Sequence, residues 1–120
     1  MTSAGRSMGN AKALMTLELS EAPLAVRRQE EALAQPMSAL VQRLQLRPPQ
    51  VVVTCARGSS AHAAAFAKHL IERYVGIPVA PAAPSVVSIY GQSMLLKDQL
   101  VLSISQSGLC VDLIAFTNSA

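Results

Sequence analysis

The sequence has no tryptophan, and aromatic residues make up only 3% of its 120 residues. Any hydrophobic core must therefore be built from aliphatic side chains. Charged residues are also few, at 14%, whereas 51% of the residues are hydrophobic. Because a chain of this composition can bury ample apolar surface, intrinsic disorder is excluded for most of its length. The length itself is typical of one domain.

The sequence also lacks a run of about 18 or more apolar residues, which a membrane-spanning helix requires. Its longest uncharged stretch, residues 77–96, is interrupted by prolines, serines and a glycine. We therefore expect no membrane partner. Residues 1–14 contain no apolar segment of a secretory signal, which favours the cytoplasm. The high apolar content instead predicts strands buried on both faces, as in a parallel sheet.

Several kinds of site are missing. No two histidines or cysteines stand at metal-ligand spacing, so we expect no metal, and Cys55 is interpreted as a small core residue. The ten basic residues are scattered without an aromatic platform, which disfavours a nucleic-acid partner. Neither a Walker motif nor G-x-G-x-x-G is present, so a nucleotide is disfavoured and no cofactor is expected.

What is present divides into three segments. Residues 1–15 are rich in glycine, serine and alanine and predict a disordered leader. Residues 16–48 have helical apolar spacing, and Pro23 and Pro36 are expected to break this segment into two or three short helices. Residues 49–120 alternate between β-branched runs and helical patterns.

This alternation predicts an α/β fold with three layers, in which a doubly wound parallel sheet of flavodoxin-like strand order follows the N-terminal helices. The expected strands cover residues 51–55, 77–80 and 99–105, and the expected helices cover 61–75 and 85–90 and begin again at 110. Three strands are few for such a sheet, which is therefore expected to be incomplete. A sheet this short leaves the edge of a strand unpaired. We therefore expect either a homo-oligomer, in the form of a dimer, or a chain that is a disrupted piece of a longer one.

Two small loops stand at equivalent places in this pattern: Gly58-Ser59-Ser60 and Ser105-Gln106-Ser107-Gly108. Each follows an expected strand and opens an expected helix. The first N–H groups of a helix have no partner within it, and its dipole adds partial positive charge there. Serine hydroxyls add further donors, and glycine, which has no Cβ, lets an anion approach the backbone. Such a loop can therefore bind a phosphate. In the strand order 2-1-3 both loops would flank one crevice.

The residues beside these loops have more than one interpretation. A serine at a helix start is usually only an N-cap. Arg57 is equally suited to contacting an anion and to facing solvent. His62 is better explained as a helix residue packed at the sheet edge than as a ligand, because it has no paired carboxylate. Asp112 would stabilise the dipole of the last helix.

The segments Cys55–Ala63 and Ser103–Gly108 resemble the two ligand loops of the sugar isomerase (SIS) domain family. The resemblance covers residues 17–113 and is nearest to the isomerase half of glutamine–fructose-6-phosphate aminotransferase and to related sugar-phosphate deaminases. It implies binding of a phosphorylated sugar, either a hexose phosphate or an amino-sugar phosphate. The ligand residues that it implies are Gly58, Ser59, Ser60, Ser105, Gln106, Ser107 and Cys110.

The resemblance is incomplete after Gly108. Cys110 stands where the family has serine or threonine, and Leu109 and Val111 also differ from the usual residues. The carboxylate base of the family's isomerase chemistry has no counterpart in this chain, so the catalytic residues are unknown and enzymatic activity is left undecided. The alternatives are a non-catalytic sugar-phosphate sensor and an inactive truncated fragment.

Overall fold

The computed structural model describes the backbone of residues 4–120 and the side chains from residue 13 onward. The chain divides into two units, one ending at Leu46 and the other comprising Arg47–Ala120. Of the predicted disordered leader, residues 1–15, the first three residues lie outside the described part of the chain. From Ala4 on, the backbone is helical.

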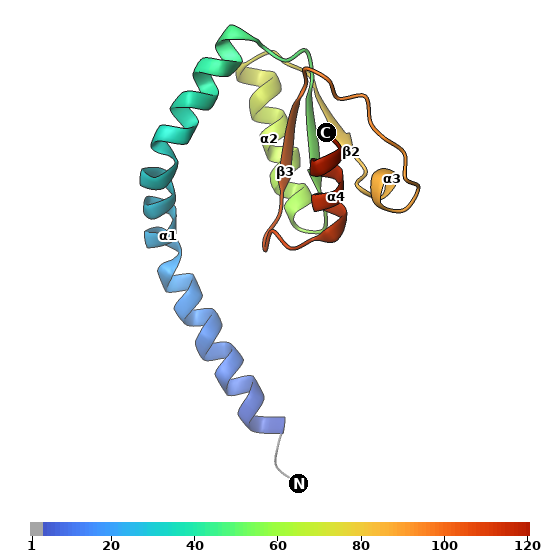
Figure 1. The fold of residues 1–120 in the computed structure, drawn as a ribbon. Helices are drawn as coiled ribbons and strands as arrows, with labels where there is room; N and C mark the ends of the chain where they lie inside the picture. Colours follow the sequence, from blue (N-terminus) through green and yellow to red (C-terminus); the bar gives the residue numbers. More distant parts are fainter. Residues whose placement is uncertain (1–3) are drawn as a thin grey trace. The chain divides into compact units, whose positions relative to one another are not determined.

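The first unit is one helix, α1 (Ala4–Leu46), drawn in Figure 1 as a continuous ribbon. The prediction of two or three short helices is therefore wrong: Pro23 and Pro36 lie inside α1. A proline removes one backbone hydrogen bond and strains the preceding turn, but it does not prevent the turns on either side from forming. Most residues between the prolines are strong helix formers such as alanine, leucine, arginine and glutamate.

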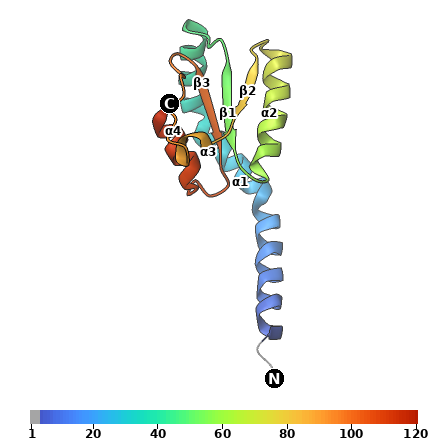
Figure 2. The same ribbon diagram turned by 90° about the vertical axis from the view of Figure 1, so that its right-hand side faces the viewer.

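The second unit is an α/β layer structure. Its elements are β1 (Val52–Ala56), α2 (Ser60–Tyr74), β2 (Val79–Ala82), α3 (Ser85–Ser88), β3 (Leu100–Ile104) and α4 (Val111–Ser119). The three strands are parallel and stand in the order β2-β1-β3. Figure 2 shows α2 on one face of this sheet and α3 and α4 on the other. The predicted three-layer, doubly wound α/β fold is thereby confirmed.

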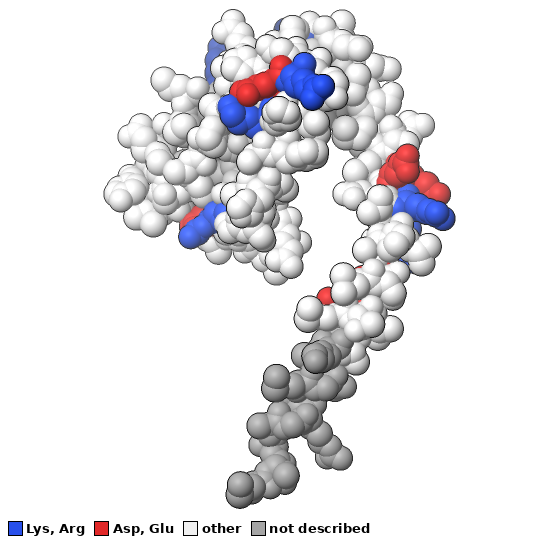
Figure 3. All heavy atoms as spheres, turned by 180° about the vertical axis from the view of Figure 1, so that it is seen from behind, with Lys and Arg blue, Asp and Glu red and all other residues white. Residues whose placement is uncertain are grey.

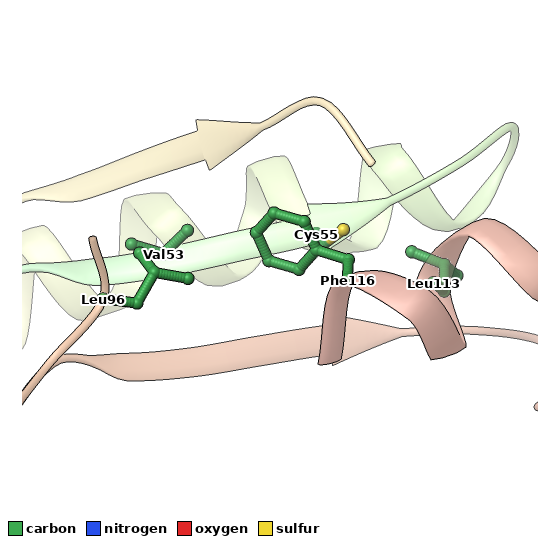
Figure 4. Packing of buried hydrophobic residues seen from close by; sticks show 5 residues of the cluster. All are labelled: Val53, Cys55, Leu96, Leu113 and Phe116. Atoms are coloured by element: carbon green, nitrogen blue, oxygen red, sulfur yellow. The ribbon is translucent and has the colours of Figure 1, made fainter. Parts of the chain in front are cut away.

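The central strand β1 is buried on both faces, as its β-branched sequence predicts. Val53 and Cys55 point towards α4, where they form a cluster with Leu96, Leu113 and Phe116 (Figure 4). The intervening residues of β1 face the other way, towards α2. Because successive side chains of a strand alternate between faces, β1 contributes to the cores on both sides of the sheet.

The opposite face of the sheet is covered by α2 through small side chains. Ala64 is the buried residue of this helix. Its outer side carries an exposed row of Phe66, Leu70 and Tyr74. None of the helices within residues 4–120 combines the length and apolar content needed to cross a membrane.

A polar link joins the last turns of α2 to the start of β2. The Glu72 carboxylate accepts hydrogen bonds from the Lys68 ammonium group, at 2.6 Å, and from the Val79 backbone N–H, at 3.0 Å. The same ammonium group donates to the Val79 carbonyl at 2.8 Å. The hydrogen bond from Lys68 and then that from Val79 lower the pKa of Glu72 below its ordinary value.

The two phenylalanines of the chain provide a matched test of the core. Phe116 is completely buried, whereas Phe66 is 64% exposed. We expect Phe116→Ala to lower the free energy of unfolding by about 3–5 kcal/mol, because it leaves a cavity against β1. Phe66→Ala should change it by less than about 1 kcal/mol. Urea unfolding followed by circular dichroism measures both values, and equal losses would contradict this core.

The Glu72 link should make stability depend on pH. Its depressed pKa means that the carboxylate stabilises the folded state above its ordinary pKa of 4.5, and that this contribution is lost as the pH falls through the folded value. Glu72→Gln should therefore lower the melting temperature at pH 7, and the difference from the natural chain should vanish in acid. Glu31→Gln on α1 serves as the control. A difference that stays constant down to pH 3 would refute the link.

Candidate phosphate-binding site

The two serine loops begin side by side. Ala56, the last residue of β1, is the register partner of Ile104, the last residue of β3. Because the strands are parallel and adjacent, both chains leave the sheet at the same edge. The connections from β1 and β3 then enter helices on opposite faces, so this edge is a topological switch point of the sheet.

The first loop leaves the hydroxyl of Ser59 without a capping role. Gly58 has a φ of 57°, a conformation that glycine adopts without a steric penalty. The backbone N–H groups of Ala61 and His62 donate to the carbonyls of Gly58 and Ser59, both at 3.1 Å. The amides that precede Ala61 therefore form the open end of α2. Ser59 occupies the N-cap position, but its hydroxyl makes no capping hydrogen bond, so the simple N-cap interpretation is not supported.

The second loop is held by hydrogen bonds between its backbone and its own serine hydroxyl groups. The Gly108 N–H donates to Ser105 Oγ at 3.0 Å, and the Leu109 N–H donates to Ser107 Oγ at 3.3 Å. A hydroxyl that accepts a hydrogen bond still has its proton to donate, so both serines keep a donor for an anion. Cys110 is the N-cap of α4 and makes no side-chain capping bond. Gly108 has a φ of 69°, which again suits glycine.

An ion pair connects the two loops. The Arg57 guanidinium, next to Gly58, contacts the carboxylate of Asp112 in the first turn of α4. The Arg57 side chain is 59% exposed and that of Asp112 is 22% exposed. The Arg57 guanidinium is therefore already paired, so it neither faces solvent alone nor is free to bind an anion. The Asp112 carboxylate compensates the charge of Arg57 as well as the dipole of α4. The two residues are 55 positions apart, so sequence spacing gave no indication of this contact.

The other candidate side chains contribute no reactive group. Cys55 is completely buried, and burial first, then the nearby Cys110, raises the pKa of its thiol. The thiol therefore stays protonated, as its interpretation as a core residue requires. His62 is exposed near the start of α2. Within residues 13–120, no three histidine, cysteine or acidic side chains are placed to hold a metal ion.

The charge around the loops is modest. On the face that Figure 3 displays, basic side chains occur in small groups beside acidic ones rather than as a continuous patch. The loops themselves, residues 57–60 and 105–112, contain one basic and one acidic side chain, and these two are paired. An anion here would be held chiefly by hydroxyl groups, backbone amides and helix dipoles, which suits one phosphate better than a polyphosphate.

Comparison with known proteins identifies a similar solved structure. It is the crystal structure of a protein from Silicibacter pomeroyi DSS-3 that is provisionally named a phosphosugar isomerase. The two chains are 39% identical with a TM-score of 0.81 over 88% of the present chain. This match confirms the resemblance to the sugar isomerase domain on which the ligand residues were assigned.

The match has a defined extent. It covers 32% of the Silicibacter chain, so the present chain spans about a third of the length of that protein. No protein-family model matches the chain, and no curated protein matches it. What the match shows the two chains to share is the fold.

The pairing of Arg57 with Asp112 can be measured by a double-mutant cycle. Because the pair is partly exposed, its coupling energy should be about 0.2–1 kcal/mol at low salt and should fall in high salt. We expect Arg57→Gln and Asp112→Asn to be non-additive in urea unfolding at low salt. Arg73→Gln, which removes an exposed arginine from α2, should be additive with Asp112→Asn. Additivity in both cycles would disprove the ion pair.

Proposed function

We propose that this chain binds a phosphorylated sugar, either a hexose phosphate or an amino-sugar phosphate, between its two serine loops. The premise is its confirmed resemblance to the sugar isomerase domain. The observation that carries the proposal is the register of β1 with β3, which starts both loops from paired residues at one edge of the sheet. Gly58, Ser59 and Ser60 would provide one side of the site, and Ser105, Gln106, Ser107 and Cys110 the other.

The chemistry of these groups suits a phosphate monoester. Hydroxyl protons and the amides at the starts of α2 and α4 are donors directed at the helix ends, where the dipoles favour negative charge. Each hydrogen bond to a charged group contributes about 1.5–3 kcal/mol, so four to six of them can hold a small phosphate without a lysine. Cys110 is the weakest member of this set, because a thiol is a poor donor.

Arg57 would lie at the rim of this site with its charge already engaged. Its contact with Asp112 holds the start of the first loop against the start of α4, which limits the spread between the loops. A bound phosphate would compete with Asp112 for the guanidinium. We expect Arg57 to help hold the two loops together and the serines to supply most of the affinity.

We further propose that the chain is the N-terminal part of a sugar-phosphate isomerase, aminotransferase or deaminase. Aldose–ketose interconversion moves a proton between adjacent carbons and needs a carboxylate base. Asp112, the one carboxylate within the loops, is held by Arg57. This chain would therefore supply the binding residues, and the base would come from another segment or subunit. We expect it to act in the cytoplasm as a homo-oligomer, in the simplest case a dimer.

The same observation favours a second candidate, a non-catalytic sugar-phosphate sensor. A site that has phosphate donors but no free base can bind its ligand without converting it. The two candidates share the ligand and differ in turnover. In isomerase and deaminase assays with the same sugar phosphates, turnover by this chain, alone or as a homo-oligomer, would exclude the sensor, because turnover requires a base.

Ligand binding should raise thermal stability. A ligand that binds only the folded form adds about 2.7 kcal/mol when present at 100 times its dissociation constant. We expect fructose 6-phosphate or glucosamine 6-phosphate to raise the melting temperature of the natural chain, and Ser59→Ala combined with Ser107→Ala to abolish the rise. Differential scanning fluorimetry measures both.

Two controls make this titration specific. Unphosphorylated fructose should give no shift, since the proposed donors act on the phosphate. Ser93→Ala, which removes an exposed hydroxyl from the segment between α3 and β3, should leave the shift intact. An unchanged shift in the double serine variant, or no shift with any sugar phosphate, would overturn the proposed site.

A further inference from the structure

The side chains of α1 carry an apolar row that is not buried. Every residue from 13 to 43 is exposed, including Met15 at 63% and Val26 at 62%, and Leu44 is half-buried. Contiguous apolar surface of this length is uncommon on a soluble protein unless another surface covers it. The spacing of its residues and the charges beside them indicate which surface covers this row.

The row, called here the α1 seam, follows one side of the helix. Its members are Met15, Leu19, Ala22, Val26, Leu33, Met37, Leu40 and Leu44. Successive members are separated by 4, 3, 4, 7, 4, 3 and 4 residues. Over eight turns this spacing averages about 3.6 residues per turn, the period of a straight α-helix. The seam therefore runs along the helix without winding around it.

The seam has the same spacing in both directions. Its midpoint lies between Gln29 and Glu30, and each member has a counterpart at equal distance on the other side. A two-fold interface requires such self-complementarity, because the same surface must fit itself after rotation. Pro23 and Pro36 also lie at equal distances from this midpoint, so any bends at the prolines would coincide in two antiparallel copies.

The charges that flank the seam determine the direction of pairing. By helical periodicity, Glu18 and Arg43 lie along one flank, and Arg27 and Glu30 along the other. Antiparallel copies would place Glu18 near the partner's Arg43 and Arg27 near the partner's Glu30. Parallel copies would turn each flank towards the other flank of the partner, where none of these side chains meets an opposite charge at its own level. The pattern therefore favours the antiparallel arrangement.

The remaining side of the helix lacks this order. Glu21, Arg28 and Glu31 lie there, separated by the exposed leucines Leu17 and Leu24. This side has no continuous apolar row, and at equal distances beyond the midpoint its two leucines have the glutamines Gln42 and Gln35 as counterparts. It supplies a control surface of the same helix.

We propose that α1 is a dimerisation helix that pairs in antiparallel orientation, along the α1 seam, with α1 of a second copy of this chain. This inference goes beyond the proposed function and does not depend on any ligand. It assigns the contact surface of the expected dimer to α1 and leaves both serine loops outside that surface. The other possible occupants, the α/β unit of the same chain and a different protein, give other results in the experiment below.

The test compares two pairs of substitutions by sedimentation velocity of the full chain. Val26→Glu with Leu33→Glu places carboxylates in the centre of the seam, and should raise the dimer dissociation constant about a hundredfold or more. Leu17→Glu with Leu24→Glu on the other side should leave it within about threefold. A monomeric natural chain, or equal effects of the two pairs, would overturn the proposal, and circular dichroism verifies that α1 is still helical.

Charge exchange checks the pairing without placing charge in the seam. Arg27→Glu should weaken the dimer, because it faces the partner's Glu30, and adding Glu30→Arg should restore it. Disulfide trapping then tests the direction. Gln29→Cys, at the midpoint, should form a covalent dimer on oxidation, whereas Met15→Cys should not exceed the background of the natural cysteines. Crosslinking through position 15 alone, or no rescue by the double exchange, would overturn antiparallel pairing.

Discussion

The parallel pairing of β1 with β3 is the constraint on which the rest of the α/β unit depends. It puts Ala56 beside Ile104, and therefore starts both serine loops at the same edge of the sheet. The pairing is stabilised by the burial of β1, whose Val53 and Cys55 pack against α4 while Val52 and Thr54 are buried towards α2. A strand that was polar on one face could not be covered by helices on both sides.

The proposed site would bind its anion through neutral donors rather than through free charges. Each loop ends at the open end of a helix, so the donors come from backbone amides and hydroxyl groups that folding itself positions. The single arginine is balanced by Asp112. Without an anion the site therefore has little net charge, and like charges do not repel across the loops. The arrangement favours a small anion that can accept several hydrogen bonds over one that needs several cations.

The sequence predicted the α/β unit more completely than α1, for physical reasons. The run Val51–Val53 between prolines and a glycine loop has few alternatives to a buried strand, so β1 begins within one residue of its expected start. In α1, the local rule that proline breaks a helix was outweighed by long flanking stretches of helix-forming residues. The Arg57–Asp112 contact could not be predicted, because it depends on the relative position of two strands rather than on either local sequence. The roles of the individual serines towards a ligand are still predictions.

The core and the site are not separable in this unit, because the position of the second loop follows that of β3 and α4. β3 lies at the edge of the sheet, so its loop is anchored by the pairing with β1 on one side and by α4 at its end. Leu113 and Phe116 fix α4 against Val53 and Cys55, and Ser103 of β3 meets Thr117 of α4 at 2.8 Å. Any loosening of that packing moves the start of α4, and with it Cys110 and the carboxylate that holds Arg57. The spacing between the two loops is therefore set by the apolar side chains of β1, at some distance from any atom that a ligand would touch.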